Sequence, residues 1–408
     1  MSLNTALSGL LGAQTGLNVV SNNLANASTV GFKSGTAHFS DTYPAGGSDG
    51  VGQGVTASFT SQDFSQGDLT STGNALDLAI QGNGFFITEK NGTTSYSRDG
   101  GFQLSPTGEL QNGNGSAVQG FGIKANGQAD GLLGPVSIST SPEPAQASAQ
   151  ISLNAALNSA DPVNATPFDP TDSNTFDEAT SVTAFDSLGN ANRIQLYFAR
   201  QAASASATTP SPWSIYAQPE AASGTTVGSA QALTTLSFGN DGTLTSGAQA
   251  TLNVNWGNGA APSNIAFDFG GTALSNQDFA INSLTNDGFA PGAYTGTKVS
   301  ANGDVNVSYS NGRTKTVATL AMASFINNQG LIPTSHNLFQ ASTNSGAAVV
   351  NQSGAGVNGS LVAGALEKSN VETSNSLVEL INYQEAYQAN TSVIQGAQQD
   401  VQKLLQIS

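Results

Sequence analysis

The spacing of hydrophobic side chains changes twice along this 408-residue chain, and this change limits the folds open to it. Residues 3–24 carry leucines at alternating heptad a and d positions, and the far end repeats an apolar side chain every seven residues. The predicted helical packing residues are Leu3, Leu7, Leu10, Leu17 and Leu24, and Leu380, Tyr387, Ile394 and Val401. The segments between these ends alternate with a period of two, which predicts β-strands. The fold class expected is α+β multidomain, with terminal α-helical coiled-coil arms paired around mainly antiparallel β domains.

The two arms differ in their intrinsic helix signals. Gly9, Gly12 and Gly16 interrupt the first arm, and each costs about 1 kcal/mol relative to alanine, so this arm is expected to fold only against a partner. The second arm is expected over 377–407, with a capping box formed by Ser376 and Glu379 at its start. A helix pair within one chain and a bundle between copies of the chain both satisfy these patterns.

The middle of the chain shows two β regions. "GFFITEKNGTTSYSRDGGFQLSPTGELQN" alternates strand-like runs with Asn-Gly and Pro-Thr-Gly turns, and "SVTAFDSLGNANRIQLYFAR" marks a second region. Breaks occur at "TSPEPAQASAQ" and "NDGFAPGA". Residues 143–286 are therefore predicted to form a second β domain that is inserted into the first.

Charge and cysteine content exclude several classes of function. The net charge is -16 and there is no cluster of Lys or Arg, so we expect no nucleic-acid partner. Only 9% of residues are charged, against about 25% in an ordinary soluble domain, which suits surfaces that are buried against other copies. The first 32 residues carry no charge and no basic segment of a signal peptide, and no apolar run is long enough for membrane insertion.

Candidate chemical sites are few. The chain has two histidines, His38 and His336, and no cysteine, so no catalytic, cofactor-binding or metal site is predicted. "GGSDGVGQG" and "GNGFFI" are interpreted as turns, and "DPTDSNTFDEAT" as a solvated acidic loop. Trp213 and Trp256 are interpreted as core residues.

Three segments, in this order, resemble the bacterial flagellar rod and hook family: "SNNLANASTVGFKSG", "ALDLAIQGNGFFI" and "LEKSNVETSNSLVELINYQEAYQANTSVIQGAQQDVQKLL". The resemblance covers roughly residues 1–105 and 287–408, and the large inserted module favours the hook branch. The residues that match the family motifs are Asn22, Asn23, Leu24, Ala25, Asn26, Gly31, Phe32, Tyr383, Gln388, Ala389 and Asn390. In the first motif, the asparagines can satisfy backbone groups at a helix end, Gly31 permits a positive φ, and Phe32 anchors the chain.

The resemblance implies a structural subunit, without enzymatic activity or cofactors, that polymerises into the curved tubular hook, a universal joint between motor and filament. It implies a helical inner-tube domain (1–30 and 370–408), a connecting domain (31–72 and 355–369), a middle β domain (73–142 and 287–354) and an outer β domain (143–286). The implied partners are other copies of the chain, the distal rod protein, the hook–filament junction protein, the hook cap and the flagellar type III export apparatus. The implied localisation is the extracellular hook, reached without a cleaved signal peptide.

Two details of the resemblance remain open. Phe39 and Tyr43 match an aromatic-xxx-aromatic export signal, and they equally fit an ordinary pair of buried aromatics. Glu385 stands in a C-terminal segment that lacks the basic residue usual in related helices, which argues against charge pairing between subunits there.

Two alternative functions stay open at this point. A distal rod subunit would share the terminal arms, but should lack the 143–286 module. A secreted β-rich surface adhesin or array protein would carry its binding function in the middle of the chain. The terminal heptads and the missing signal peptide argue against the second alternative.

Overall fold

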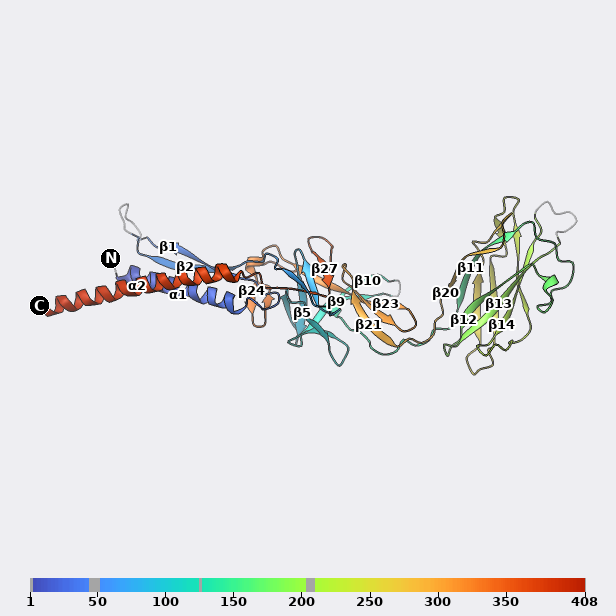
Figure 1. The fold of residues 1–408 in the computed structure, drawn as a ribbon, viewed down its shortest axis with the longest axis horizontal. Helices are drawn as coiled ribbons and strands as arrows, with labels where there is room; N and C mark the ends of the chain where they lie inside the picture. The colour runs from blue at the N-terminus through green and yellow to red at the C-terminus, as the bar shows by residue number, and fades with distance from the viewer. Residues whose placement is uncertain (1–2, 44–51, 125–126, 203–209, 408) are drawn as a thin grey trace. The chain divides into compact units, whose positions relative to one another are not determined.

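The computed structural model describes residues 3–43, 52–124, 127–202 and 210–407. The chain forms two compact units. Unit 1 comprises residues 1–140, 296–308 and 314–408, and unit 2 comprises residues 141–295 and 309–313. Both chain ends belong to unit 1, so unit 2 is an insertion between its two halves (Figure 1).

The helices at the two ends are α1 (Leu3–Ala25) and α2 (Thr373–Ile407). With the antiparallel β body between them, they confirm the predicted fold class. The start predicted for the second helix is wrong by several residues. The backbone N–H of Ser376 donates to the carbonyl of Glu372 at 3.0 Å, so a helical turn is already closed there, and Ser376 lies inside the helix and not at a capping box.

Unit 1 contains one large sheet and three small strand pairs. The large sheet runs in the order β21-β22-β23-β9-β5-β6-β25-β24, with β10, β26, β7 and β8 attached to it. Its strands are β5 (Phe85–Lys90), β6 (Thr93–Ser97), β7 (Phe102–Leu104), β8 (Leu110–Asn112), β9 (Ala117–Ile123), β10 (Ala129–Pro135), β21 (Tyr294–Val299), β22 (Asp304–Tyr309), β23 (Thr314–Ser324), β24 (Ile332–Thr334), β25 (Leu338–Gln340) and β26 (Val349–Gln352). The 3₁₀ helix η2 (Asn328–Gly330) precedes β24.

Two of the three small pairs join segments near the two ends of the chain, and the third is a hairpin near the N-terminus. They are β1 (Gly35–Asp41) with β2 (Val55–Gln62), β3 (Leu69–Ser71) with β28 (Ala365–Glu367), and β4 (Leu78–Gln81) with β27 (Ser360–Ala363). All three pairs are antiparallel. The C-terminal segment thus returns to the N-terminal segment through two strand pairs before α2 begins.

Unit 2 is a sandwich of two five-stranded sheets. One sheet contains β11 (Gln150–Asn158), β17 (Gln249–Val254), β18 (Ser263–Asp268), β19 (Ala273–Ser275) and β20 (Ala280–Asn286). The other contains β12 (Glu178–Phe185), β13 (Ala191–Arg200), β14 (Trp213–Glu220), β15 (Gln231–Phe238) and β16 (Leu244–Ser246). The 3₁₀ helix η1 (Ser173–Thr175) lies before β12. Most pairs are antiparallel, but β11 runs parallel to both β18 and β19.

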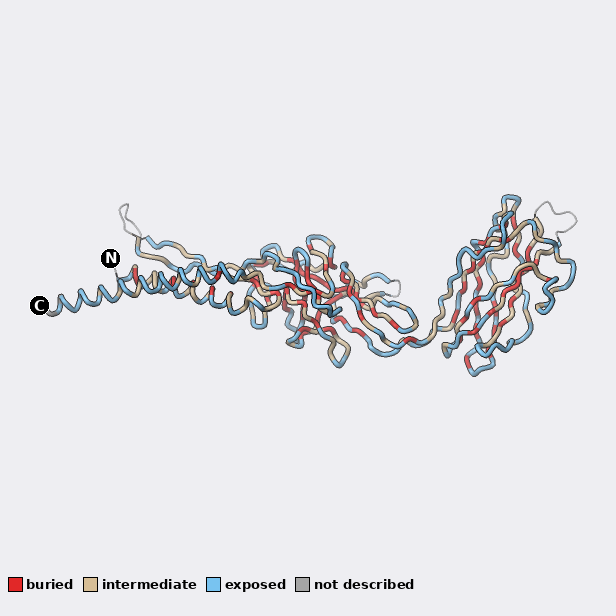
Figure 2. Tube along the Cα trace, viewed as in Figure 1, coloured by how far each residue is buried: buried red, intermediate tan, exposed pale blue. Residues whose placement is uncertain are grey.

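The core of unit 2 is drawn from both of its sheets. Alternate residues of β11 and β14 are buried, as a period of two requires when each sheet has one covered face. In β13 the alternation ends at residues 196–199, which are all buried. Trp213 and Trp256 lie in this core, which confirms their interpretation as core residues, and Trp256 Nε1 donates to Ser263 Oγ at 2.8 Å. Figure 2 shows buried residues within the large sheet of unit 1 and within unit 2, whereas the β1–β2 hairpin has none and α2 is coloured almost entirely as exposed.

Candidate functional site

The two terminal helices pack against each other in opposite directions. Gly9 of α1 lies against Asn390 of α2, and Gly16, seven residues later, lies against Tyr383, seven residues earlier. A Cβ atom added to Gly9 would lie 2.7 Å from Asn390 Oδ1, and one added to Gly16 would overlap the Tyr383 ring. The helices therefore meet where α1 has no side chain, and two larger side chains of α2 occupy that space.

The register of this contact leaves the end of α2 without a partner in α1. The same seven-residue step places Asn23 opposite Ser376, and both are buried. In the other direction it places the start of α1 opposite Gly396. Residues 397–407 of α2 therefore extend past α1 (Figure 1), and Leu405 on this extension is 71% exposed.

The predicted leucine stripe lies mostly outside the buried face of α1. Leu3 and Leu7 are 50% and 46% exposed, and Leu10, Leu17 and Leu24 are half-buried. On α2, Leu380 and Ile394 are half-buried, while Tyr387, Val401 and the motif residues Gln388 and Ala389 are exposed. The residues of α1 that are buried are mostly small: Ala6, Gly12, Ala13, Gly16, Val20 and Asn23. Packing of the leucine stripe between copies of the chain stays a prediction.

The β1–β2 hairpin packs on α1 beside the helix pair. A Cβ atom on Gly12 would lie 3.3 Å from Val55 Cγ1 and 3.7 Å from the Phe39 ring. The Phe39 ring centroid is 6.3 Å from that of Tyr383. Of the two aromatics of the possible export signal, Phe39 is thus half-buried in this contact, and Tyr43 is exposed.

The first family motif forms the turn that leaves α1. Asn26 Nδ2 donates to the carbonyl of Asn22 at 2.9 Å at the end of the helix. Asn23 holds the backbone of Gly35 from both sides: its Oδ1 accepts from the N–H at 2.8 Å, and its Nδ2 donates to the carbonyl at 2.7 Å. Gly31 has the predicted positive φ, +65°. Leu24 and Phe32 are half-buried and Ala25 is exposed.

Gly31 also has no room for a side chain. A Cβ atom there would lie 2.6 Å from the backbone carbon of Arg98 and 2.6 Å from the backbone nitrogen of Asp99. Its own N–H donates to the carbonyl of Glu367 at 2.7 Å. The turn after α1 thus packs closely on the β body and is hydrogen-bonded to β28.

Three charged side chains meet inside unit 1 directly after this turn. Lys33 Nζ lies 2.6 Å from Glu367 Oε1, and Arg98 Nη1 lies 3.3 Å from Glu367 Oε2. Lys33 and Glu367 are completely buried, and Arg98 almost completely. Burial lowers the pKa of both Lys33 and Arg98, whereas the hydrogen bonds and the negative charge of Glu367 raise them. Glu367 is therefore the group that favours the charged forms of both cations.

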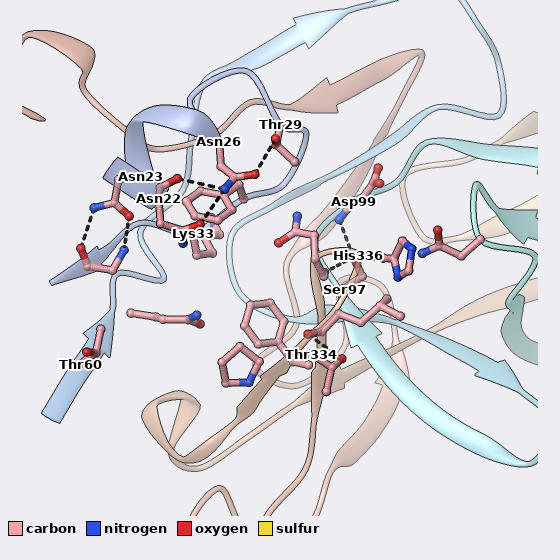
Figure 3. Close-up of a pocket in the computed structure, with 18 of the residues that line it drawn as sticks. Asn22, Asn23, Asn26, Thr29, Lys33, Thr60, Ser97, Asp99, Thr334 and His336 are labelled. Carbon is pink, nitrogen blue, oxygen red and sulfur yellow. Dashed lines mark hydrogen bonds between the residues drawn. The ribbon is translucent and has the colours of Figure 1, made fainter. Parts of the chain in front are cut away.

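A groove of about 790 Å³ lies beside the motif turn. Side chains from α1, the turn, β2 and the β24–β25 hairpin line it, and the labelled residues in Figure 3 include Asn22, Asn26, Thr60, Asp99 and His336. Most of these groups are amides or hydroxyls. Such a lining offers hydrogen bonds to a polar surface.

The other candidate residues lie apart from this site or form ordinary structural contacts. His38 stacks on Phe59 with ring centroids 4.6 Å apart, and its Nε2 lies 2.7 Å from Ser61 Oγ. In the acidic loop, Asp172 Oδ1 accepts from Asn174 N–H at 3.0 Å. Over the ranges that the structure describes, no group of three or more His, Cys, Asp or Glu residues is arranged to hold a metal ion.

Two of the predicted turn segments have different outcomes. In "GNGFFI", Gly82 and Gly84 have φ of +104° and +118° before β5, as turn glycines do. Most of "GGSDGVGQG" lies outside the described residues. Among the helices within the described ranges, none is long and apolar enough to cross a membrane.

The residues that build this site were partly missed by the sequence analysis. Helix propensity alone marks Gly9 and Gly16 as weak points of a helix, although their seven-residue spacing matches that of Tyr383 and Asn390. Lys33 was noted only as part of the motif, yet it is the first charged residue of the chain. Arg98 and Glu367 had no sequence signal, since their meeting depends on the return of the C-terminal strand.

Known proteins resemble this chain along its whole length. The chain is 35% identical over 413 residues to the flagellar hook protein FlgE of Salmonella typhimurium and 36% identical over 414 residues to that of Escherichia coli, with all of each chain covered. The chain belongs to the flagellar hook protein family. The predicted resemblance is therefore confirmed for the hook branch, and this hook subunit is a structural component of the bacterial flagellum.

Family models match successive parts of this hook subunit. The flagella basal body rod protein model matches residues 3–33, and the FlgE/F/G hook protein D1 domain model matches 79–157. The FlaE D2 domain model matches 152–289, and the FlgEFG C-terminal model matches 362–407. A solved structure of Helicobacter pylori FlgE2 aligns with a TM-score of 0.58 at 13% identity, covering 73% of this chain and all of that one, which supports the fold.

Proposed function

We propose that this hook subunit polymerises through its paired terminal helices into a curved tube that transmits motor torque to the filament. The observation that carries this proposal is the apolar surface left on both helices. The exposed apolar side chains of the pair are Leu3, Leu7, Leu11, Leu377, Val378, Ile381, Tyr387, Val393, Val401 and Leu405. Burial of such side chains stabilises a complex by roughly 25 cal/mol per Å², so a lattice of copies is the arrangement that covers them.

The predicted domain division assigns a role to each part. Residues 1–30 and 370–408 would line the tube, 31–72 and 355–369 would connect, and 73–142 and 287–354 would form the middle layer. Residues 143–286 would form an outer layer, where polar, weakly charged surfaces permit hydrated sliding contacts between neighbours. An in-frame deletion of 143–286 is then expected to straighten the tube, and electron microscopy measures its curvature.

The remaining parts of the proposal concern delivery and neighbours. The subunit would be exported unfolded through the flagellar type III channel without a cleaved signal peptide, with Phe39 and Tyr43 as candidate signal residues. Its neighbours at the two ends of the tube would be the distal rod protein and the hook–filament junction protein, with the hook cap present during growth. No catalytic step is part of this function.

The deciding experiment measures the critical concentration for tube formation by sedimentation, with tubes identified by electron microscopy. Leu7→Ala removes a half-exposed side chain, so it should leave the stability of the single chain unchanged. If Leu7 is buried between copies, the substitution costs about 2–5 kcal/mol per subunit and prevents or strongly weakens assembly. Asn18→Ala, at another exposed position of α1, is the matched control and should be mild. Equal critical concentrations for Leu7→Ala and the unmodified chain would contradict the proposal.

A further inference from the structure

A single buried carboxylate lies at the base of both terminal helices. Lys33 follows the end of α1 by eight residues, and Glu367 precedes the start of α2 by six. We propose that Glu367 is a positioning residue that makes docking of the N-terminal arm conditional on docking of the C-terminal strand, so that the helix pair forms only in a chain whose two ends have both returned to the β body.

Glu367 holds three separate chain segments through its side chain. Besides the ion pairs with Lys33 and Arg98, its Oε1 accepts from the backbone N–H of Gly67 at 2.9 Å. Its backbone carbonyl accepts from Gly31 in the motif turn. The N-terminal motif, the 63–68 segment and the β body are thus all bonded to one residue of β28.

The cations have only partial support without this carboxylate. Lys33 Nζ also donates to the carbonyl of Ser65 at 2.6 Å, and Arg98 Nη2 to the carbonyl of Gly82 at 2.8 Å. These oxygens are neutral, and Arg98 Nε has no hydrogen-bond partner. The charge of Asp63 also favours protonated Lys33, but Asp63 is exposed to solvent. If Glu367 were absent, docking Lys33 would bury a second cation beside Arg98 with no buried negative charge to compensate them.

The proposal implies an order of docking, in which β28 docks first and the N-terminal arm follows. While β28 is undocked, Lys33 has a lower free energy in water than in the interior, so the motif turn and α1 stay released. When β28 pairs with β3, Glu367 enters, and it compensates both cations at once. The α1–α2 contact at Gly9 and Gly16 then follows, because the end of α1 and the start of α2 are now both held at the β body.

The test measures hydrogen exchange in the full-length chain, kept below the concentration at which it assembles. Glu367→Gln keeps the shape and removes the charge. Exchange of α1 amides is expected to rise by at least about 100-fold, as expected when one partner of a buried ion pair is lost, while β5 and β6 keep their protection. Glu385→Gln makes the same change of charge on an exposed residue of α2 and should have no effect.

A second substitution distinguishes charge compensation from simple loss of hydrogen bonds, because the two explanations predict opposite changes in the protection of α1 amides. Lys33→Met in the Glu367→Gln background removes one uncompensated cation, so it should restore part of the α1 protection, although it weakens docking in the unmodified chain. If Glu367→Gln yields no folded chain, recovery of folding by Lys33→Met is the same positive result.

Three results would overturn the proposal: no effect of Glu367→Gln, equal loss of protection in β5 and β6, or a double variant less protected than Glu367→Gln alone. This inference concerns the single chain. A failure to form tubes would count against the proposed function and not against the role of Glu367, and the reverse also holds.

Discussion

Unit 2 and the terminal helix pair differ in how many of their apolar side chains are buried within the single chain. Unit 2 encloses a continuous core between its two sheets, in which Trp213, Phe198 and Phe267 are completely buried. In α2, among the residues whose burial is described, Ser376 alone is buried. One part of the chain completes its core by itself, whereas the other keeps apolar side chains at its surface. We therefore expect unit 2 to fold alone, and in the proposed tube neighbouring copies would cover the helix pair.

Removing the two helices should have the largest effect on assembly. Deletion of residues 1–30 and 370–408 should abolish tube formation and leave a monomer, because the apolar surface of α1 and α2 is lost with them. Sedimentation measures assembly, and urea unfolding followed by tryptophan fluorescence reports on unit 2, which contains Trp213 and Trp256. Tubes formed by the truncated chain would show that assembly does not need the helices, and loss of cooperative unfolding would show that unit 2 does not fold without them.

A large cavity in the core of unit 2 is the next test. Phe267→Ala removes a completely buried ring and should lower the free energy of unfolding of unit 2 by about 3–5 kcal/mol. Leu188→Ala, at a residue that is 58% exposed, is the control and should change it by less than about 0.5 kcal/mol. Urea unfolding followed by tryptophan fluorescence gives both values. Because unit 2 completes its own core, the helical signal at α1 and α2 should not change in either variant.

Acid should destabilise unit 2 through a specific carboxylate. Burial alone would raise the pKa of Asp186, but the side chains of Asn190, Asn258 and Asn192 and the N–H of Asn190 donate to it and lower the pKa to about 2. A lowered pKa in the folded state stabilises the fold above the unfolded pKa of 3.8, and this stabilisation is lost as the pH falls towards 2. The difference in free energy of unfolding between the unmodified chain and Asp186→Asn should shrink by about 2 kcal/mol between about pH 6 and about pH 2. A difference that does not vary with pH would contradict this assignment.

The smallest expected effects are the changes in helix stability when two glycines of the helix pair are replaced by alanine, and these changes should have opposite signs. Gly396 lies on α2 opposite the start of α1, and a Cβ atom added there would have nothing within 4 Å. Gly396→Ala should therefore stabilise the helix by about 1 kcal/mol. Gly16→Ala brings the same gain in helix propensity, but the new methyl group overlaps the Tyr383 ring, and such overpacking costs about 1–3 kcal/mol. Hydrogen exchange of α1 and α2 amides measures both changes. Stabilisation by both substitutions would show that the close glycine contact does not determine the pairing.

The fold class could be predicted from the sequence because local periodicity reports burial. Alternation in strands such as β14 follows from one covered face, and Trp213 begins a run that alternates buried and half-buried residues throughout. The helical ends were likewise visible in their heptads. Where each helix begins is determined by a backbone hydrogen bond, as at Ser376, and apolar spacing does not encode that bond.

The site was harder to predict, for two physical reasons. A heptad of leucines indicates an apolar stripe but not which molecule covers it, and within one chain the pairing face holds Gly9 and Gly16 instead. The ion cluster depends on Lys33 and Glu367, which are 334 residues apart and brought together by β28. Neither a contact between residues so far apart along the chain nor the burial of those charges leaves a local pattern in the sequence.

The contact between Gly16 and Tyr383 has an expected mechanical consequence. Because the ring occupies the space left by a missing side chain, a pull along α2 should press Tyr383 against the neighbouring turns of α1, and load would pass between the helices by steric contact. The first 32 residues carry no charge, so ionic attraction has no part in this transfer along α1. The resistance of the pair to axial pulling should therefore be nearly independent of salt concentration, because dissolved ions screen charges and not steric contact.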